Sequence, residues 1–197
     1  MTPGSEVARR LAHHAEWVRS LGAAGKRLVA PGLDLAGQDL RTQNLSEVTL
    51  TDANLSGADL SGVSLYAADL RGARLDGCRL DGARLGKADL TRCSMAGASA
   101  RDAEFYSAEL DRTVLRGADL TGARLAGAGF RDADLRESLL AGVDVARAVL
   151  VRVDLTGAVV RAWEGVELLQ ATDVVVGAGA APLSGDTFLD WVRRAGG

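Results

Sequence analysis

The sequence predicts an all-β solenoid built from stacked coils, and three observations indicate this fold class. A large apolar residue recurs every five residues from Leu35 to Val160. A small residue, usually alanine, stands two places before it, and glycine often stands two places after it. Only 4% of the residues are aromatic although 47% are hydrophobic, so the core must be built mainly from aliphatic side chains.

The large apolar position is almost invariant along the chain. Of the 26 positions divisible by five between 35 and 160, 20 are leucine, two are phenylalanine, and the others are Met95, Ala100, Val145 and Val160. Two places earlier, 15 of the 26 residues are alanine, and glutamine occurs only at the start. A period of five fits neither a helix, with its period of 3.6, nor a strand, with its period of two. It does fit a coil of short strands joined by turns.

Glycine marks the corners of the expected coil. If four repeats complete one coil, the large residue points inward from the middle of each side, and the small residue lies near a corner where space is short. Glycine two places after the central residue supplies the positive φ that a type II turn requires. The sequence places glycine there at Gly57, Gly62, Gly72, Gly77, Gly82, Gly117, Gly122 and Gly127.

This pattern resembles the pentapeptide-repeat family, whose repeat reads Ala/Cys/Ser/Thr/Val, Asp/Asn, Leu/Phe and two further residues of any type. The resemblance covers about residues 33 to 160 without a frame shift. It implies a right-handed quadrilateral parallel β-helix. With coils ~4.8 Å apart, the 26 repeats would make about 6.5 coils and a rod roughly 31 Å long.

Both flanks of the repeat are expected to cover the open ends of the stack, which expose apolar side chains and unpaired backbone groups. Residues 1–32 form the expected N-terminal cap, with an amphipathic helix over 5–22, Ser5 as its N-cap and Gly22 at its end. Residues 33–160 form the β-helix. Residues 161–197 form the expected C-terminal cap, with a strand and a short helix that Asp186 caps.

The C-terminal helix carries the apolar residues Phe188, Leu189, Trp191 and Val192. In the family that this sequence resembles, such a segment often forms a dimer contact, so a homodimer through this end is one expectation. Several outward positions near this end are also apolar, namely Val114, Leu139, Val149, Val151 and Val159. We expect either the terminal segment or a second subunit to cover them.

No group of residues in the sequence predicts catalysis, a cofactor or a metal. His13 and His14 are adjacent and lack a nucleophilic partner, so we expect a solvated or capping role. Cys78 and Cys93 fall on the small inward position, where buried thiols are inert. Gly177 to Gly179 lacks the rest of a phosphate-binding loop and is expected to be a linker. The recurring aspartates are expected to bond turn amides or to be solvated.

The expected function therefore lies on the surface. Folding the chain at four repeats per coil places Tyr66 and Tyr106 in one column, with Gly86 between them. Exposed tyrosines flanked by cations are typical of interaction hot spots, and chance placement is the alternative. The cations expected alongside are Arg84, Lys87, Arg124 and Arg147.

The best-known activity that the resemblance implies is protection of type II topoisomerases, chiefly gyrase, by a rod that imitates DNA. Residues 34–160 carry 19 acidic and 15 basic side chains, only four more acidic than basic, whereas a duplex of similar length carries about 18 negative charges. The acidic excess is at the N-terminal end of the repeat, at Asp34, Asp39, Glu47, Asp52, Asp59 and Asp69. The expected cap beside it is basic, with Arg9, Arg10, Arg19, Lys26 and Arg27.

Two functions stay open at this point. The first is a non-enzymatic, protein-binding rod that modulates or protects DNA gyrase or another topoisomerase. The second is a structural or interaction scaffold for an unrelated protein. The net charge of −3 and the pI near 5.4 do not favour direct binding of nucleic acid, and no apolar run is long enough to predict a membrane span. Two unpaired cysteines and a charged N-terminus favour the cytoplasm.

Overall fold

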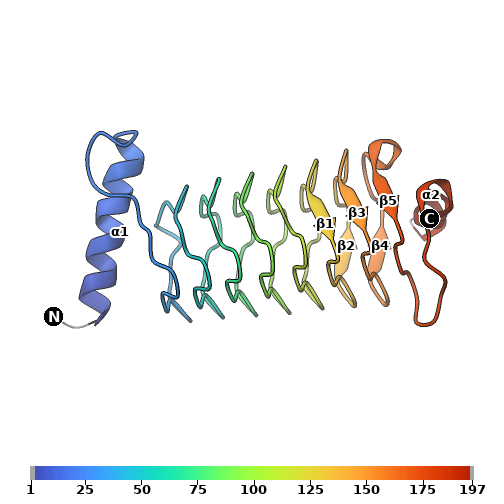
Figure 1. The fold of residues 1–197 in the computed structure, drawn as a ribbon, viewed down its shortest axis with the longest axis horizontal. Helices are drawn as coiled ribbons and strands as arrows, with labels where there is room; N and C mark the ends of the chain where they lie inside the picture. The colour runs from blue at the N-terminus through green and yellow to red at the C-terminus, as the bar shows by residue number, and fades with distance from the viewer. Residues whose placement is uncertain (1–2, 196–197) are drawn as a thin grey trace.

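The chain forms a rod of stacked coils with a helix at each end (Figure 1). The computed structural model describes residues 3–195. The first helix, α1, spans Pro3–Arg19 and lies across the N-terminal end of the stack. The last helix, α2, spans Gly185–Ala195 and lies at the opposite end. Neither of these described helices is long and apolar enough to cross a membrane.

Each coil has four sides, and each side is one repeat. Parallel backbone bridges join positions 20 apart along four ladders, which we call the 29, 34, 39 and 44 faces after their first residues, Val29, Asp34, Asp39 and Asn44. The N–H of Leu50 donates to the carbonyl of Asp69 on the next coil at 2.8 Å, and the same bond recurs coil after coil. The predicted parallel β-helix is confirmed.

The pairing lengthens into regular strands toward the C-terminal end. On the 29 face, β1 (Gly129–Arg131) pairs with β3 (Val149–Val151), which pairs with β5 (Gln170–Thr172). On the 39 face, β2 (Leu139–Ala141) pairs with β4 (Val159–Arg161). All of these pairs are parallel. In the earlier coils the same pairing is a single bridge per side.

The interior is filled by the residues that recur every five positions. Each of the 26 central residues from Leu35 to Val160 is buried, with at most 6% of its surface exposed. Where the small inward residue is polar, its hydroxyl bonds a backbone carbonyl: Thr113 donates to Leu90 at 2.9 Å and Ser138 to Leu135 at 2.7 Å. The stack therefore accepts small polar side chains only where the backbone satisfies them.

The corners are β-turns whose third residue has a positive φ, whether or not that residue is glycine. Gly62 has φ 69°, but Glu47, Asp52 and Ala67 take the same conformation at 59°, 55° and 54°. This conformation costs a residue with a Cβ roughly 1 to 2 kcal/mol. The pairing of the coils, and not glycine alone, therefore imposes the corner geometry.

Helix α1 begins at Pro3, so the expectation that Ser5 is its N-cap is wrong. Proline suits the first turn of a helix because its φ is already fixed near the helical value and because a backbone N–H at this position would have no partner within the helix. The helix ends at Arg19, before the expected end at Gly22. Beyond it, the N–H of Leu21 bonds Val18 at 3.2 Å and that of Gly22 bonds Trp17 at 2.9 Å, which closes the C-terminal turn.

The two adjacent histidines of α1 have different surroundings. His13 is exposed, whereas His14 is fully buried and stacks on Trp17, with ring centroids 5.8 Å apart. The expected solvated role is thus wrong for His14, and the expected capping role fits it. Its Nδ1 accepts the N–H of Leu28 at 3.2 Å, which joins the helix to the segment that enters the first coil.

The coil pairing continues past Val160, where the sequence register changes. The short 3₁₀ helix η1 (Val166–Leu168) takes up one extra residue, so Leu150 pairs with Ala171 at a spacing of 21 instead of 20. Helix α2 then begins at Gly185, so Asp186 lies in its first turn and is not its N-cap. Phe188 and Val192 of α2 are buried.

A charge inside the stack is predicted to be far more damaging than one on its surface. Leu75 is fully buried among leucines, so Leu75→Lys would place an ammonium group where it has neither water nor a partner. We expect a loss of about 4 kcal/mol or more in the free energy of unfolding. Ser61→Lys, at an outward corner, should lower the free energy of unfolding by only about 1 kcal/mol, because it removes the hydrogen bond that the Ser61 hydroxyl donates to Asp59. Urea unfolding measures both, and equal losses would contradict the inward assignment.

The N-terminal end of the rod is predicted to weaken in mild acid. Burial lowers the pKa of His14 below 6.5, and the positive charge of the nearby Arg27 lowers it further. The Ser46 backbone and the Glu47 carboxylate oppose this shift. Nε2 of His14 has no hydrogen-bond partner among the described residues. The unfolded chain therefore binds a proton near pH 6.5 that the folded chain resists, and stability falls as the pH drops below about 6.5.

The slope should not exceed about 1.4 kcal/mol per pH unit for this one group. Thermal unfolding between about pH 7.5 and 5.5 should show a smaller loss for His14→Asn than for the unsubstituted protein. His13→Asn, which changes an exposed imidazole one residue away, is the matched control and should keep the full loss. Identical slopes for all three proteins would show that other groups carry the pH dependence.

Candidate protein-binding surfaces

Three of every five residues in a repeat point outward, and the repeat fixes their local conformation. The Asp or Asn before the central leucine is on the ladder, and its side-chain oxygen accepts the backbone N–H two residues later, as Asp154 does from Thr156 at 2.9 Å. This bond closes the corner turn. It also occurs at Asp34, Asp39, Asn44, Asn54, Asp59, Asp69, Asp89, Asp119, Asp134 and Asp144. The expectation that these carboxylates bond turn amides is confirmed.

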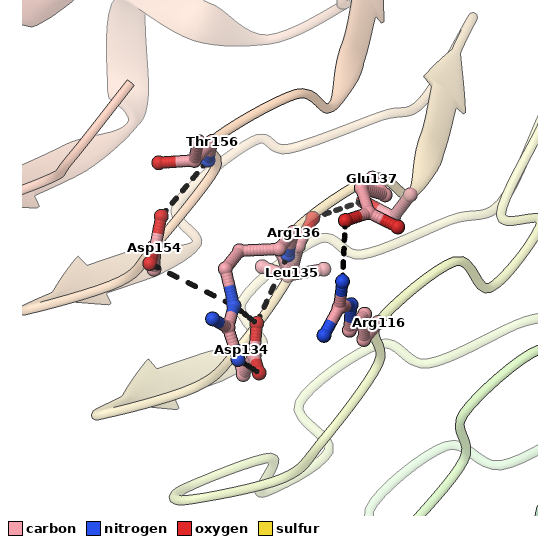
Figure 2. Close-up of polar contacts among 8 residues, drawn as sticks. Arg116, Asp134, Leu135, Arg136, Glu137, Asp154 and Thr156 are labelled. Carbon is pink, nitrogen blue, oxygen red and sulfur yellow. Dashed lines mark hydrogen bonds and ion pairs between the residues drawn. The ribbon is translucent and has the colours of Figure 1, made fainter. Parts of the chain in front are cut away.

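Arginine joins some of these aspartates across neighbouring coils. Arg136 binds both carboxylate oxygens of Asp134, at 2.8 and 2.5 Å, and its Nε lies 3.8 Å from Asp154 on the next coil (Figure 2). Arg116 in turn pairs with Glu137 at 2.6 Å. We call an arginine placed in this way, with one aspartate two residues before it and another on the next coil, an arginine clip.

Two further clips hold part of the predicted acidic end. Arg41 binds Asp39 at 2.9 and 2.7 Å and lies 3.6 Å from Asp59. Arg71 binds Asp69 at 2.8 and 2.7 Å. Hydrogen bonding to Arg41 lowers the pKa of Asp39 to about 2. Three of the six carboxylates of the predicted acidic end are therefore paired with guanidinium groups.

The structure does not gather the acidic end on one surface. Asp34 is on the 34 face, Asp39 and Asp59 are on the 39 face, and Asp69 is on the 29 face. Glu47 and Asp52 occupy two different corners with positive φ. The negative charge consequently surrounds the first coils, and no described face carries all six residues.

The predicted tyrosine surface does come together on the 44 face. The ammonium group of Lys87 lies 5.6 Å from the centre of the Tyr66 ring, and the Tyr66 hydroxyl raises the pKa of Lys87. Tyr106 is 40% exposed. The expected gap at Gly86 is filled, because the Tyr106 ring lies across it: a Cβ on Gly86 would be 2.5 Å from Cζ of Tyr106.

The cations beside the two tyrosines differ in their pairing. Arg124 binds Glu104 at 3.0 Å. Arg84 and Arg147 are exposed and form no ion pair with any residue that the structure describes. The 44 face thus carries two aromatic rings, an ammonium group on one of them and two unpaired guanidinium groups. We call Tyr66, Arg84, Lys87 and Tyr106 the tyrosine surface.

The predicted C-terminal contact residues are mostly turned toward their own chain. Phe188 is fully buried, and its ring lies 6.4 Å from Trp163 and 5.8 Å from Trp191, centre to centre. Val192 is buried, and Leu189 and Trp191 are half-buried. Trp163 anchors this group through its Nε1, which donates to the Leu140 carbonyl at 2.7 Å.

The outward apolar residues near this end lie on three different faces. Val114 is on the 34 face, Leu139 and Val159 are on the 39 face, and Val149 and Val151 are on the 29 face. Helix α2 packs on β4 and β5, whereas Val114 and Leu139 stay 37% and 40% exposed. The terminal segment therefore covers part of this apolar group, and no single surface contains it.

The two thiols are structural. Cys78 and Cys93 are buried, and burial raises the pKa of each to about 12. The Cys93 thiol donates to the Leu70 carbonyl at 2.8 Å. Among residues 3–195 the structure shows no group of three or more His, Cys, Asp or Glu side chains arranged to hold a metal ion.

Comparison with known proteins identifies the repeat. A pentapeptide-repeat family model matches eight copies over residues 44–82, 78–117, 101–135 and 128–161. No curated protein matches the chain in sequence. A pentapeptide repeat protein from the thylakoid lumen of Arabidopsis thaliana is 32% identical over 54% of this chain and 67% of its own, with a TM-score of 0.38.

Two other solved structures match most of the chain. HetL from Nostoc sp. strain PCC 7120, a pentapeptide repeat protein involved in regulation of heterocyst differentiation, is 24% identical over 84% of this chain and 98% of its own, with a TM-score of 0.36. QnrB1, a plasmid-mediated fluoroquinolone resistance protein, is 14% identical over 84% and 98%, with a TM-score of 0.44. These scores are low, so the assignment rests on the repeat itself. Since the family model matches residues 44–161, more than half of the chain, the protein belongs to the pentapeptide-repeat family.

Proposed function

We propose that this protein is a non-enzymatic rod that binds another protein through its side faces. The observation that carries the proposal is the division between a fully packed interior and an outward surface of evenly spaced ladders. Every central residue is buried, and the aspartates before them bond turn amides. The coils leave the exposed faces and the two ends as the places where this chain meets other molecules.

The tyrosine surface is the side face that we assign to partner binding. Tyrosine contributes large contact area with few rotatable bonds, and arginine pairs well with a partner's carboxylates, so both are enriched at hot spots. Tyr106 is exposed, and the guanidinium of Arg84 is free of ion pairs among the described residues. The other three faces carry paired charges and small polar side chains, with scattered apolar residues toward the C-terminal end.

A type II topoisomerase, chiefly DNA gyrase, is the partner that the family resemblance favours. The uninterrupted rod supports the assignment of a topoisomerase as the partner. The arginine clips weaken a purely electrostatic imitation of DNA, so in this proposal the rod acts through shape and through the tyrosine surface more than through charge. The alternative is a scaffold for an unrelated protein in the cytoplasm, and the clips favour it because they lower the free negative charge. A homodimer through the C-terminal end remains a prediction.

A gyrase assay distinguishes the two functions. In the proposed role, micromolar protein should alter supercoiling or reduce the DNA cleavage that a fluoroquinolone traps. Arg41→Gln with Arg71→Gln frees the clipped carboxylates and should strengthen the effect if charge contributes. If neither supercoiling nor cleavage changes at that concentration, gyrase is not the partner and the scaffold function is favoured.

The tyrosine surface has its own test. Tyr66→Ala with Tyr106→Ala should weaken partner binding at least about tenfold, a typical hot-spot loss of over about 1.4 kcal/mol. Gly86→Ala should act in the same direction, because its new Cβ would displace the Tyr106 ring. Val114→Ala, an equally exposed apolar change on the 34 face, is the control. Binding is measured with gyrase or, if gyrase is unaffected, with the protein that the unsubstituted chain retains from a lysate; full binding by the double variant would exclude this face.

A further inference from the structure

The N-terminal end of the rod contains a cavity of about 480 Å³ between α1 and the segment that enters the first coil. The helix contributes Glu6, Arg9, Arg10 and His13, which share one face because they are spaced three and four residues apart. The segment contributes Lys26 and Arg27 on the opposite wall. Four permanent cations and one carboxylate therefore line a single cavity, in a chain whose net charge is −3.

The walls of this cavity are held in place by the backbone. Gly25 has φ 75° and passes so close to the helix that a Cβ there would overlap the carbonyl oxygen of His13. The N–H of Lys26 then donates to that carbonyl at 3.0 Å. Arg10 reaches across and donates to the carbonyl of Val29 at 2.8 Å. The two walls are thus joined at both ends, and the cations on them face a common space.

The positive charge of the cavity is largely uncompensated. Glu6 pairs with Arg9 at 2.5 Å. Arg10, Lys26 and Arg27 form no ion pair with any residue between 3 and 195 that the structure describes. Like charges held together in this way repel one another, and a bound anion with several negative charges relieves that repulsion. A single carboxylate would balance only one of the three.

We propose that this cavity binds a small anion that carries several phosphate groups, either a nucleotide or a free polyphosphate. Guanidinium groups bind phosphate through paired hydrogen bonds, and lysine adds a compact positive charge. The volume lies within the range of about 300 to 1,000 Å³ that is typical of small-molecule sites. Val29, 47% exposed at the edge of the cavity, offers an apolar contact to a base or sugar if the anion is a nucleotide.

Titration calorimetry on the full chain tests this site with three probes: inorganic tripolyphosphate, ATP and adenosine. We expect tripolyphosphate and ATP to bind saturably at one site per chain and adenosine not to bind. ATP that binds at least about tenfold more tightly than tripolyphosphate would identify a nucleotide, and equal affinities would identify the phosphates alone as the bound group.

Lys26→Glu with Arg27→Glu should weaken both anions at least about tenfold. The matched control is Arg19→Glu with Arg79→Glu, which changes the net charge equally at two exposed positions outside the cavity and should leave affinity within about twofold. Circular dichroism confirms that both variants keep the coils. Absence of saturable binding by both anions, equal weakening in the two variants, or binding of a short DNA duplex without binding of the small anions would overturn the proposal.

Discussion

The structure depends on the pairing of each coil with the next one, four repeats further along the chain. Most of the backbone N–H groups on each side bond carbonyls of the neighbouring coils, and others bond within the turn, so the rod needs no long strands and no second layer. The same spacing stacks each central apolar residue on another. A shift of one residue would turn the leucines outward, and the one extra residue near η1 lies in the last coil, after the run of central leucines.

The surface follows from this pairing as directly as the core does. A residue on a ladder has its nearest neighbours on the adjacent coils, so Arg41 contacts Asp59 and Arg136 approaches Asp154. Carboxylates that contribute to an acidic excess in the sequence are paired, in the structure, with arginines of their own and of the neighbouring coil. What a partner meets is accordingly set by the few outward groups that the ladders leave unpaired.

Both ends of the stack would expose apolar side chains and unpaired backbone groups, and a different set of residues packs against each end. Helix α1 packs on the first coil through Leu11 and the buried His14, and its Arg9 and Arg10 line the cavity between the helix and residues 26–29. At the other end, Phe188 and Val192 of α2 pack with Trp163 over the last strands. At this end the rings of Trp163, Phe188 and Trp191 pack on one another, whereas the N-terminal end has a cavity lined by cations.

The sequence by itself determined the solenoid, its five-residue frame and the inward residues, because a periodic apolar position has one arrangement that buries all of its members. It also placed Tyr66 and Tyr106 on one face, since that needs only the coil length. The tertiary structure decided what depends on side-chain direction and on contacts between distant residues. These are the ring of Tyr106 across Gly86, the clips that pair three of the six acidic residues, the burial of His14 and the cavity between α1 and residues 26–29. No local pattern encodes them, because each arises only when a coil or helix lies against its neighbour.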